Sequence, residues 1–404
     1  MMSSENTISK TANLLVVLGD VGGYGAELER VVEGFCGVVA RSVEEMSRVD
    51  SERVYVCGDV GLLPDADARV RVIRELSSGF DGRPVEVVGV GQVPLLVRDV
   101  GVLYRRFFDE ENLFGRIQAE HVFQDLTEST KKSKALRTGI YLTDVTREVE
   151  DGEREVLNFR LLRCSSNLTG PTDNLRETDR MIMDAINAAA GEVFEQETSL
   201  NHVLAQIYEN TKDDDERGRE RKAKISAHSD KTKDMRADGL IAFCTFYDQE
   251  GFEHLEPSGV DPHDWCFKKT SGLTRLHFKL KPTAEGSGLV EEFAVTLYPN
   301  SLFIIPLSTN RLYTHAIRPS LLNVDRIPTR MGYVVRSSSA EARFMDGRTY
   351  LVEDGALIPL EPMTHDALTG LRRSYYEENR TADEIAYGEV RFSMNEGDYQ
   401  KPIL

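Results

Sequence analysis

The chain has 404 residues, of which 40% are hydrophobic and 29% are charged, and its formal net charge is −18. This length is sufficient for two or three domains with a sizeable core, and the composition is ordinary for a globular protein. The negative charge disfavours a general binder of nucleic acids or anionic membranes, because such partners repel an acidic surface, whereas a local basic groove is compatible with it.

The sequence pattern carries no targeting or membrane signal. No run of about eighteen apolar residues predicts a transmembrane helix, and the first segment lacks the basic region of a signal peptide. The five cysteines are odd in number, far apart and without a CxxC pair, which indicates thiols in a reducing compartment rather than a disulfide framework or a zinc site. We therefore expect an intracellular protein, cytoplasmic or nuclear, with no membrane partner.

Residues 1–98 alternate between short apolar runs and amphipathic segments. This alternation predicts a small α/β domain with a parallel sheet. The expected strands cover residues 13–20, 52–59 and 84–91, and the expected helices cover residues 26–46 and 67–79.

The same segment weakly resembles a degenerate calcineurin-like metallophosphoesterase. Gly-Asp follows two strands, at Asp20 and Asp59, as in that family. The first motif lacks its histidine, and the third, Gly89-Val90-Gly91, lacks Asn and His. A dinucleotide-binding fold is the alternative, but "GDVGGYGAE" does not match GxGxxG. Two aspartates without histidine partners should not hold a binuclear metal centre, so we expect a domain without catalysis of its own.

The remainder divides into a mixed part, a strand-rich part and a tail. Residues 99–345 form the predicted second domain, and residues 346–404 a C-terminal extension. Spaced strands without intervening helices indicate an antiparallel sandwich or barrel over residues 200–345. The expected helices cover residues 102–126, 180–194 and 365–380. The expected strands cover residues 134–145, 201–210, 239–248, 274–282, 291–299, 301–308 and 330–338.

A candidate metal site begins in this strand-rich part. His228 and Asp230 form an HxD motif, and His315 follows a later apolar strand. Two histidines and one carboxylate are the facial triad that leaves open positions on Fe(II). Arg330 and Arg336 are an even number of residues apart, so in a strand they lie on one face. Two guanidiniums inside a sandwich require an anion, and a dicarboxylate is suitable.

Together these motifs resemble the AlkB-like branch of the Fe(II)/2-oxoglutarate-dependent dioxygenases, over residues 100–345. That branch carries an arginine pair at about this distance after its distal histidine. It also carries Asn-x-Tyr on the strand before HxD, where this chain has Gln206-Ile207-Tyr208. Departures are Gln206 in place of Asn, Gly332 between the arginines, and longer loops before His228 and after Asp230.

The resemblance implies an α+β fold with a double-stranded β-helix (jelly-roll) core at about residues 200–345. It implies Fe(II) bound by His228, Asp230 and His315, with 2-oxoglutarate and O₂ as co-substrates. Tyr208 and Arg330 would hold the distal carboxylate of 2-oxoglutarate, and Arg336 would lie near the carboxylate that chelates iron.

The implied activity is hydroxylation of a C–H bond, and hydroxylation of an N-methyl carbon would demethylate a nucleobase or protein side chain. The primary substrate is not fixed by the sequence. The alternatives are a small-molecule hydroxylase, which the acidity favours, and an inactive binding or scaffold protein.

Other polar residues compete with this assignment. Arg318 and Arg326 are rival anchors for the co-substrate. His277 alternates with apolar residues, which indicates a structural role, whereas His254 and His263 are expected to be solvated. The basic stretch 217–224 is expected to be a solvated face or a contact for an anionic substrate.

Overall fold

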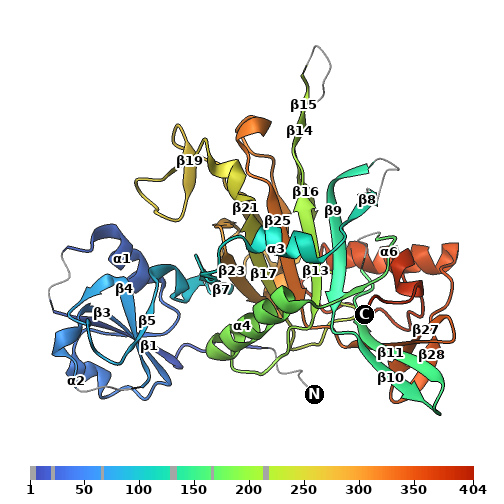
Figure 1. Cartoon of the computed structure of the whole chain (residues 1–404), viewed down its shortest axis with the longest axis horizontal. Coiled ribbons are helices and arrows are strands. Elements are labelled where there is room, and N and C mark those ends of the chain that lie inside the picture. Colours follow the sequence, from blue (N-terminus) through green and yellow to red (C-terminus); the bar gives the residue numbers. More distant parts are fainter. Residues whose placement is uncertain (1–5, 20–22, 65–67, 128–133, 165–167, 213–217) are drawn as a thin grey trace.

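The computed structural model of the chain describes residues 6–19, 23–64, 68–127, 134–164, 168–212 and 218–404. It is a mixed α+β structure with a parallel sheet and many further strands (Figure 1). Across these residues no helix combines the length and apolar character needed to cross a membrane. The five cysteines all lie in the described part and form no disulfide.

The N-terminal sheet is wholly parallel, as predicted, with strand order β2-β1-β3-β4-β5. Strand β1, which lies between β2 and β3, is buried along its whole length, and α1 packs leucine and valine side chains against one face of the sheet. Asp20 lies outside the described residues. The elements are β1 (Asn13–Leu18), α1 (Gly25–Gly34), β2 (Val38–Ala40), α2 (Val43–Met46), β3 (Arg53–Asp59), β4 (Val70–Ser78) and β5 (Glu86–Val88).

Two helix predictions in this sheet are wrong in part or in whole. The expected helix at 67–79 is strand β4, because Val70, Val72 and Ile73 are β-branched and buried between neighbouring strands. The expected helix at 26–46 ends at Gly34, and β2 follows it. At Gly37 a side chain could not fit, since a Cβ atom would lie 2.3 Å from the Asn13 carbonyl oxygen.

The central sheet has nine strands in the order β12-β9-β13-β25-β17-β23-β7-β6, with β8 also paired to β9. β6 lies before the predicted boundary at residue 98 but pairs with β7. The strands are β6 (Leu95–Val97), β7 (Gly101–Tyr104), β8 (Gln124–Thr127), β9 (Lys134–Thr143), β12 (Asp173–Asn174), β13 (His202–Tyr208), β17 (Leu240–Tyr247), β23 (Ser301–Pro306) and β25 (Arg330–Arg336).

Two helices cover one face of the central sheet (Figure 1). α3 (Leu113–Glu120) and α4 (Glu177–Val193) pack apolar side chains on it. α4 confirms the helix predicted at 180–194. The helix predicted at 102–126 is wrong at both ends, where β7 and β8 pair into the central sheet instead.

A second, four-stranded antiparallel sheet packs on the other face through aromatic and aliphatic side chains. Its order is β16-β24-β21-β22, with β16 (Ile225–His228), β21 (Arg275–Leu280), β22 (Glu292–Thr296) and β24 (Tyr313–Ile317). The short helix α5 (Leu307–Leu312) connects β23 of one sheet to β24 of the other. The space between these two sheets contains the candidate site.

The residues after 345 are integrated with earlier segments. They extend a five-stranded antiparallel sheet, β10-β11-β26-β27-β28, and then form the predicted tail helix α6. Bounds are β10 (Thr146–Glu150), β11 (Arg154–Leu161), β26 (Ala340–Met345), β27 (Arg348–Glu353), β28 (Ala356–Pro359) and α6 (His365–Glu378). The described residues also form a two-stranded hairpin, β14 (Thr211–Lys212) and β15 (Glu220–Arg221), and a three-stranded antiparallel sheet, β18 (Glu256–Pro257), β19 (Trp265–Phe267) and β20 (Thr270–Ser271).

Candidate metal centre

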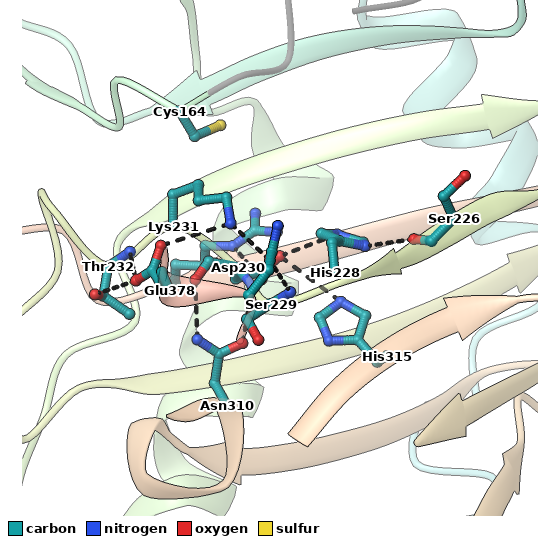
Figure 2. A network of polar contacts seen from close by, with 12 residues as sticks. Cys164, Ser226, His228, Ser229, Asp230, Lys231, Thr232, Asn310, His315 and Glu378 are labelled. Carbon is teal, nitrogen blue, oxygen red and sulfur yellow. Dashed lines mark hydrogen bonds and ion pairs between the residues drawn. The ribbon is translucent and has the colours of Figure 1, made fainter. Parts of the chain in front are cut away.

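Two histidines face each other across neighbouring strands of the four-stranded sheet. β16 ends at His228, and its antiparallel register with β24 places His228 opposite His315. The ring centroids are 4.5 Å apart. The chain leaves β16 through Ser229, and Asp230 then lies beside both rings (Figure 2). The HxD motif and the distal histidine are therefore together in space, although about 85 residues of chain separate them.

The spacing of the three side chains suits one metal ion. Asp230 Oδ1 lies 3.6 Å from His228 Nε2 and 3.7 Å from His315 Nε2, and all three atoms are within 4.8 Å of one another. Two ligands of one first-row ion, each at about 2.1 Å, are separated by roughly 3–3.5 Å. Two nitrogens and one oxygen at this spacing can bind Fe(II) after small movements of the side chains.

The protonation states also suit a metal. His228 donates its Nδ1 proton to the Ser226 carbonyl oxygen at 2.9 Å, which leaves the Nε2 lone pair directed at the site. Burial, followed by the nearby His228, lowers the pKa of His315 to about 3, so its ring is neutral at pH 7. His315 Nδ1 is buried without a hydrogen-bond partner. The polar contact of this ring is therefore made through Nε2, which faces Asp230.

Arg336 holds the other oxygen of the candidate carboxylate ligand. Its Nε and Nη2 atoms both lie 2.8 Å from Asp230 Oδ2. Burial alone would raise the pKa of Asp230, but the Arg336 charge holds that pKa well below its ordinary value. The expected position of Arg336 was beside an iron-chelating carboxylate of 2-oxoglutarate. In the structure it bonds to Asp230, and its Nη1 atom remains buried without a partner.

Side chains from α5, from the last residue of α6 and from the residue after it fix the backbone of the HxD turn. Asn310 accepts a hydrogen bond from the Asp230 N–H at 2.8 Å and donates one to the Asp230 carbonyl at 2.9 Å (Figure 2). Asn379 Oδ1 accepts from the Ser229 N–H and from Lys231 Nζ, both at 2.8 Å. Glu378 accepts from the N–H and hydroxyl of Thr232. The turn is therefore held independently of any metal.

Tyr208 and Arg330 form a second polar centre on the central sheet. β13 and β25 pair with Tyr208 opposite Arg330, and the guanidinium carbon lies 4.1 Å from the tyrosine ring centroid. Arg330 is buried, and its Nη2 atom has no hydrogen-bond partner. The Tyr208 hydroxyl donates to Gln206 Oε1 at 2.9 Å. A buried cation without an anion is costly, so this pair favours an anionic ligand.

Gly332 gives Arg330 the room for this position. A Cβ atom on Gly332 would lie 2.9 Å from Arg330 Nη1 and 3.3 Å from a Tyr208 ring carbon. The glycine between the two arginines is therefore a condition for the stacked guanidinium, because any larger residue would displace it.

All six predicted site residues line one cavity of about 380 Å³. These are Tyr208, His228, Asp230, His315, Arg330 and Arg336. In β25 the even-numbered residues face this cavity, while Met331, Tyr333 and Val335 face α3 and α4. The two arginines thus project from the same face of one strand.

The rival anchors lie elsewhere. Arg326 stacks on Phe267, with its guanidinium carbon 3.9 Å from the ring centroid. Arg318 lines a neighbouring cavity together with His277. Neither arginine lines the cavity that contains the histidines.

The expected solvent exposure of the loop histidines and of the basic stretch 217–224 is only partly found in the structure. His254 is exposed, as expected. The expectation that His263 is solvated is wrong, because it packs against Gly91 and Tyr298, and burial lowers its pKa to about 4. In the basic stretch, residue 217 lies outside the described residues, and Lys224 lines the cavity.

Sequence reasoning did not identify Asn310, Asn379 or Lys231 as site residues. Lys231 and Asn379 line the cavity, and Asn310 holds Asp230. Lys231 directly follows the HxD motif, which was an available signal. Nothing in the pattern around Asn310 or Asn379 indicates that these segments return to the site.

A second histidine–carboxylate group is saturated by its own contacts. His121 Nδ1 lies 2.8 Å from Asp173 Oδ2, and His121 Nε2 lies 2.7 Å from Asp179 Oδ2. Tyr333 donates to the other oxygen of Asp179 at 2.9 Å. Burial would lower the pKa of His121, but the two carboxylates raise it to about 9. The ring is therefore a charged bridge between two aspartates, and a metal would have to displace a proton that both carboxylates stabilise.

The remaining clue to function would be similarity to known proteins. No protein-family model matches the sequence, and a search of curated proteins finds no significant match. The geometry of the site therefore carries the functional argument.

Proposed function

We propose that this chain is an Fe(II)- and 2-oxoglutarate-dependent dioxygenase that hydroxylates a C–H bond. The observation that carries the proposal is the convergence of His228, Asp230 and His315 in one cavity with the buried, unsatisfied cation Arg330. A metal triad alone is common, and a buried guanidinium alone is compatible with many anions. Their combination in one cavity favours a metal that works with an anionic co-substrate.

The arrangement of the sheets supports a double-stranded β-helix core for this domain. The four-stranded sheet packs face to face on the central sheet, and β23 passes into β24 through the short helix α5. The two histidines come from the smaller sheet, Asp230 from the turn after β16, and the two arginines from the larger sheet. Such a sandwich suits a site that is closed on two sides and open at one end.

In the proposed mechanism this chain supplies ligands, charge and orientation. The two histidines and Asp230 would hold Fe(II), which with 2-oxoglutarate and O₂ supplies oxidation of a C–H bond. Arg336 keeps Asp230 ionised through Oδ2 and leaves Oδ1 directed at the metal position. Arg330, stacked on Tyr208, would bind the distal carboxylate of 2-oxoglutarate and so orient its reactive end toward the histidines. Phe243 and Leu276 provide apolar walls that limit water.

The first test is anaerobic titration of Fe(II) and 2-oxoglutarate, which should produce a weak visible charge-transfer band. His228→Ala should abolish the band, because one imidazole ligand is lost. His277→Ala is the matched control, since His277 lies outside this cavity, and it should retain the band. Succinate formation against methylated oligonucleotides, peptides and amino acids would then search for the substrate. Turnover that survives His228→Ala would contradict the proposal, and absence of the band in wild type would favour a binding or scaffold protein.

A further inference from the structure

A second cavity, of about 470 Å³, adjoins the metal cavity. Tyr208, Ile317 and Arg330 line both of them. Most of the rest of its wall comes from residues 269–277, around β20 and the start of β21, and from the loop after β24. A volume of this size is typical of sites for small molecules. Because the two cavities share a wall, a ligand in the second would lie next to the proposed metal and co-substrate.

The charges on this wall have one sign. Among the residues that the structure describes, four cations line the cavity and no aspartate or glutamate does; the cations are Lys269, Arg275, Arg318 and Arg330. None of the four forms an ion pair with a carboxylate elsewhere in the described part of the chain, whereas Arg71 and Arg163 each do so. The whole chain has 67 acidic and 49 basic residues, so a wall without carboxylates departs from the average surface.

Two of these cations are brought together by strand register. The antiparallel pairing of β21 with β24 ends with Leu276 opposite Ile317. Arg275 precedes Leu276 and Arg318 follows Ile317, so the two arginines lie at the same end of the strand pair. Like charges across neighbouring strands are unfavourable unless a counter-charge lies between them. His277 lies near both, and its pKa is lowered first by burial and then by Arg318 and Arg275. Both arginines are exposed, so they are accessible to a ligand from solvent.

We propose that this second cavity binds a small anion that carries phosphate or carboxylate groups, and that this anion is the primary substrate. The substrate assignment rests on the proposed function. Guanidiniums bind either oxyanion through paired hydrogen bonds. The buried Arg330, with its unpartnered Nη2 atom on the shared wall, extends the positive region toward the metal cavity. A compact ligand is favoured over a nucleic acid, because the volume is limited and the net charge of −18 repels a long polyanion.

The test is calorimetric titration of the full chain with pyrophosphate and with citrate, in the presence of 2-oxoglutarate to occupy the metal cavity. The variant is Arg275→Gln with Arg318→Gln. We expect at least about tenfold weaker binding of the preferred anion, because two charge-assisted contacts are lost. The matched control is Arg372→Gln with Arg373→Gln, which removes the same charge from exposed positions on α6 and should leave binding unchanged. Preference for pyrophosphate or for citrate identifies a phosphate or a carboxylate ligand.

Three results would overturn the anion site. The first is that wild type binds neither anion. The second is that wild type and the double variant bind the anions equally well. The third is that a single-stranded oligonucleotide binds more tightly than either anion and that the double variant abolishes this binding. The iron–2-oxoglutarate band is measured in parallel and should persist in the double variant. Loss of the band in wild type, with anion binding intact, would contradict the dioxygenase and the substrate assignment but leave the anion site in place.

Discussion

The two oxygens of Asp230 have different partners, and this division explains how the candidate ligand stays ionised. Oδ2 accepts a hydrogen bond from Arg336 Nε and forms an ion pair with Arg336 Nη2, while Oδ1 faces the two histidines. A buried carboxylate left without its cation typically costs about 3–5 kcal/mol. Removing Arg336 would therefore destabilise the folded chain even without a metal, and the ion pair aims one oxygen of Asp230 at the metal position.

Gly332→Ala should weaken 2-oxoglutarate binding without unfolding the protein. The new methyl group would lie 2.9 Å from Arg330 Nη1, at the end of a flexible side chain, so the guanidinium would move rather than the strand. We expect roughly tenfold weaker 2-oxoglutarate affinity, which corresponds to the loss of about one charged hydrogen bond. The measurement is a 2-oxoglutarate titration of the charge-transfer band at saturating Fe(II).

Gly191→Ala on α4 is the control, because a Cβ atom there meets nothing within 4 Å. It should leave the affinity unchanged. Equal 2-oxoglutarate affinity in Gly332→Ala and wild type would show that Arg330 is not the anchor.

Site residues could be predicted from the sequence where their spacing matches the two-residue repeat of a β-strand. The even separation of Arg330 and Arg336 placed both on one face, and the structure has them on the cavity side of β25. The side chains that hold the turn around Asp230 could not be predicted. Asn310 and Asn379 reach Asp230 and its neighbours only because distant segments fold back, and such contacts leave no local pattern.

At the scale of elements, the end of α6 supports the HxD turn from outside both sheets. Asn379 is the residue after α6, and its side-chain oxygen accepts hydrogen bonds from Ser229 and Lys231. Glu378 holds Thr232 in the same way. The C-terminal extension is therefore part of the candidate site.

Asn379→Ala should lower Fe(II) affinity by about tenfold, because the Ser229 N–H and the Lys231 ammonium lose a shared acceptor and the turn loosens. The free energy of unfolding should fall by about 1–3 kcal/mol. Asn379→Asp keeps an acceptor and should retain most of the affinity, and Thr369→Ala on the exposed side of α6 is the control. Fe(II) titration and urea unfolding give the two values. Unchanged Fe(II) affinity in Asn379→Ala would limit this helix end to a structural role.

Element type was predictable where the pattern was strong and long. α4 and α6 have helical periodicity over 17 and 14 residues, and both were predicted. β4 lies where the sequence predicts a helix, yet Val70, Val72 and Ile73 are held by pairing with β3 and β5. The local sequence is compatible with a helix or a strand in this segment, and pairing with the neighbouring strands determines that it is a strand.

At the scale of the whole molecule, stability should depend on pH through His121, which connects β12 and α4. Its pKa in the folded chain is about 9, above its ordinary value near 6.5, so the bridge is complete below pH 6.5 and is lost as pH rises through 9. From pH 6.5 to 9 the free energy of unfolding should fall by up to about 3 kcal/mol.

The measurement is urea unfolding at several pH values for wild type and His121→Asn. Burial lowers the pKa of Lys281 to about 8, which acts in the opposite direction above pH 8, so the difference between the two proteins is the relevant quantity. That difference should shrink with rising pH, while His254→Gln, at an exposed site, should follow wild type. A difference that is constant from pH 6.5 to 9 would show that His121 is not a charged bridge.

β25 also limits how this protein can change over evolutionary time. Successive residues of this strand alternate between the cavity and the face covered by helices. Whether a residue of β25 contacts the cavity or the helices therefore depends on whether its position is even or odd. Deleting a single codon within the strand would reverse the facing of the residues on one side of the deletion, so that buried apolar side chains there would turn toward the cavity and cavity-facing ones toward the hydrocarbon packing under α4. Point substitutions can therefore adjust the chemistry of this strand gradually, whereas a frame-preserving deletion of one residue would exchange the two faces over a whole part of the strand at once.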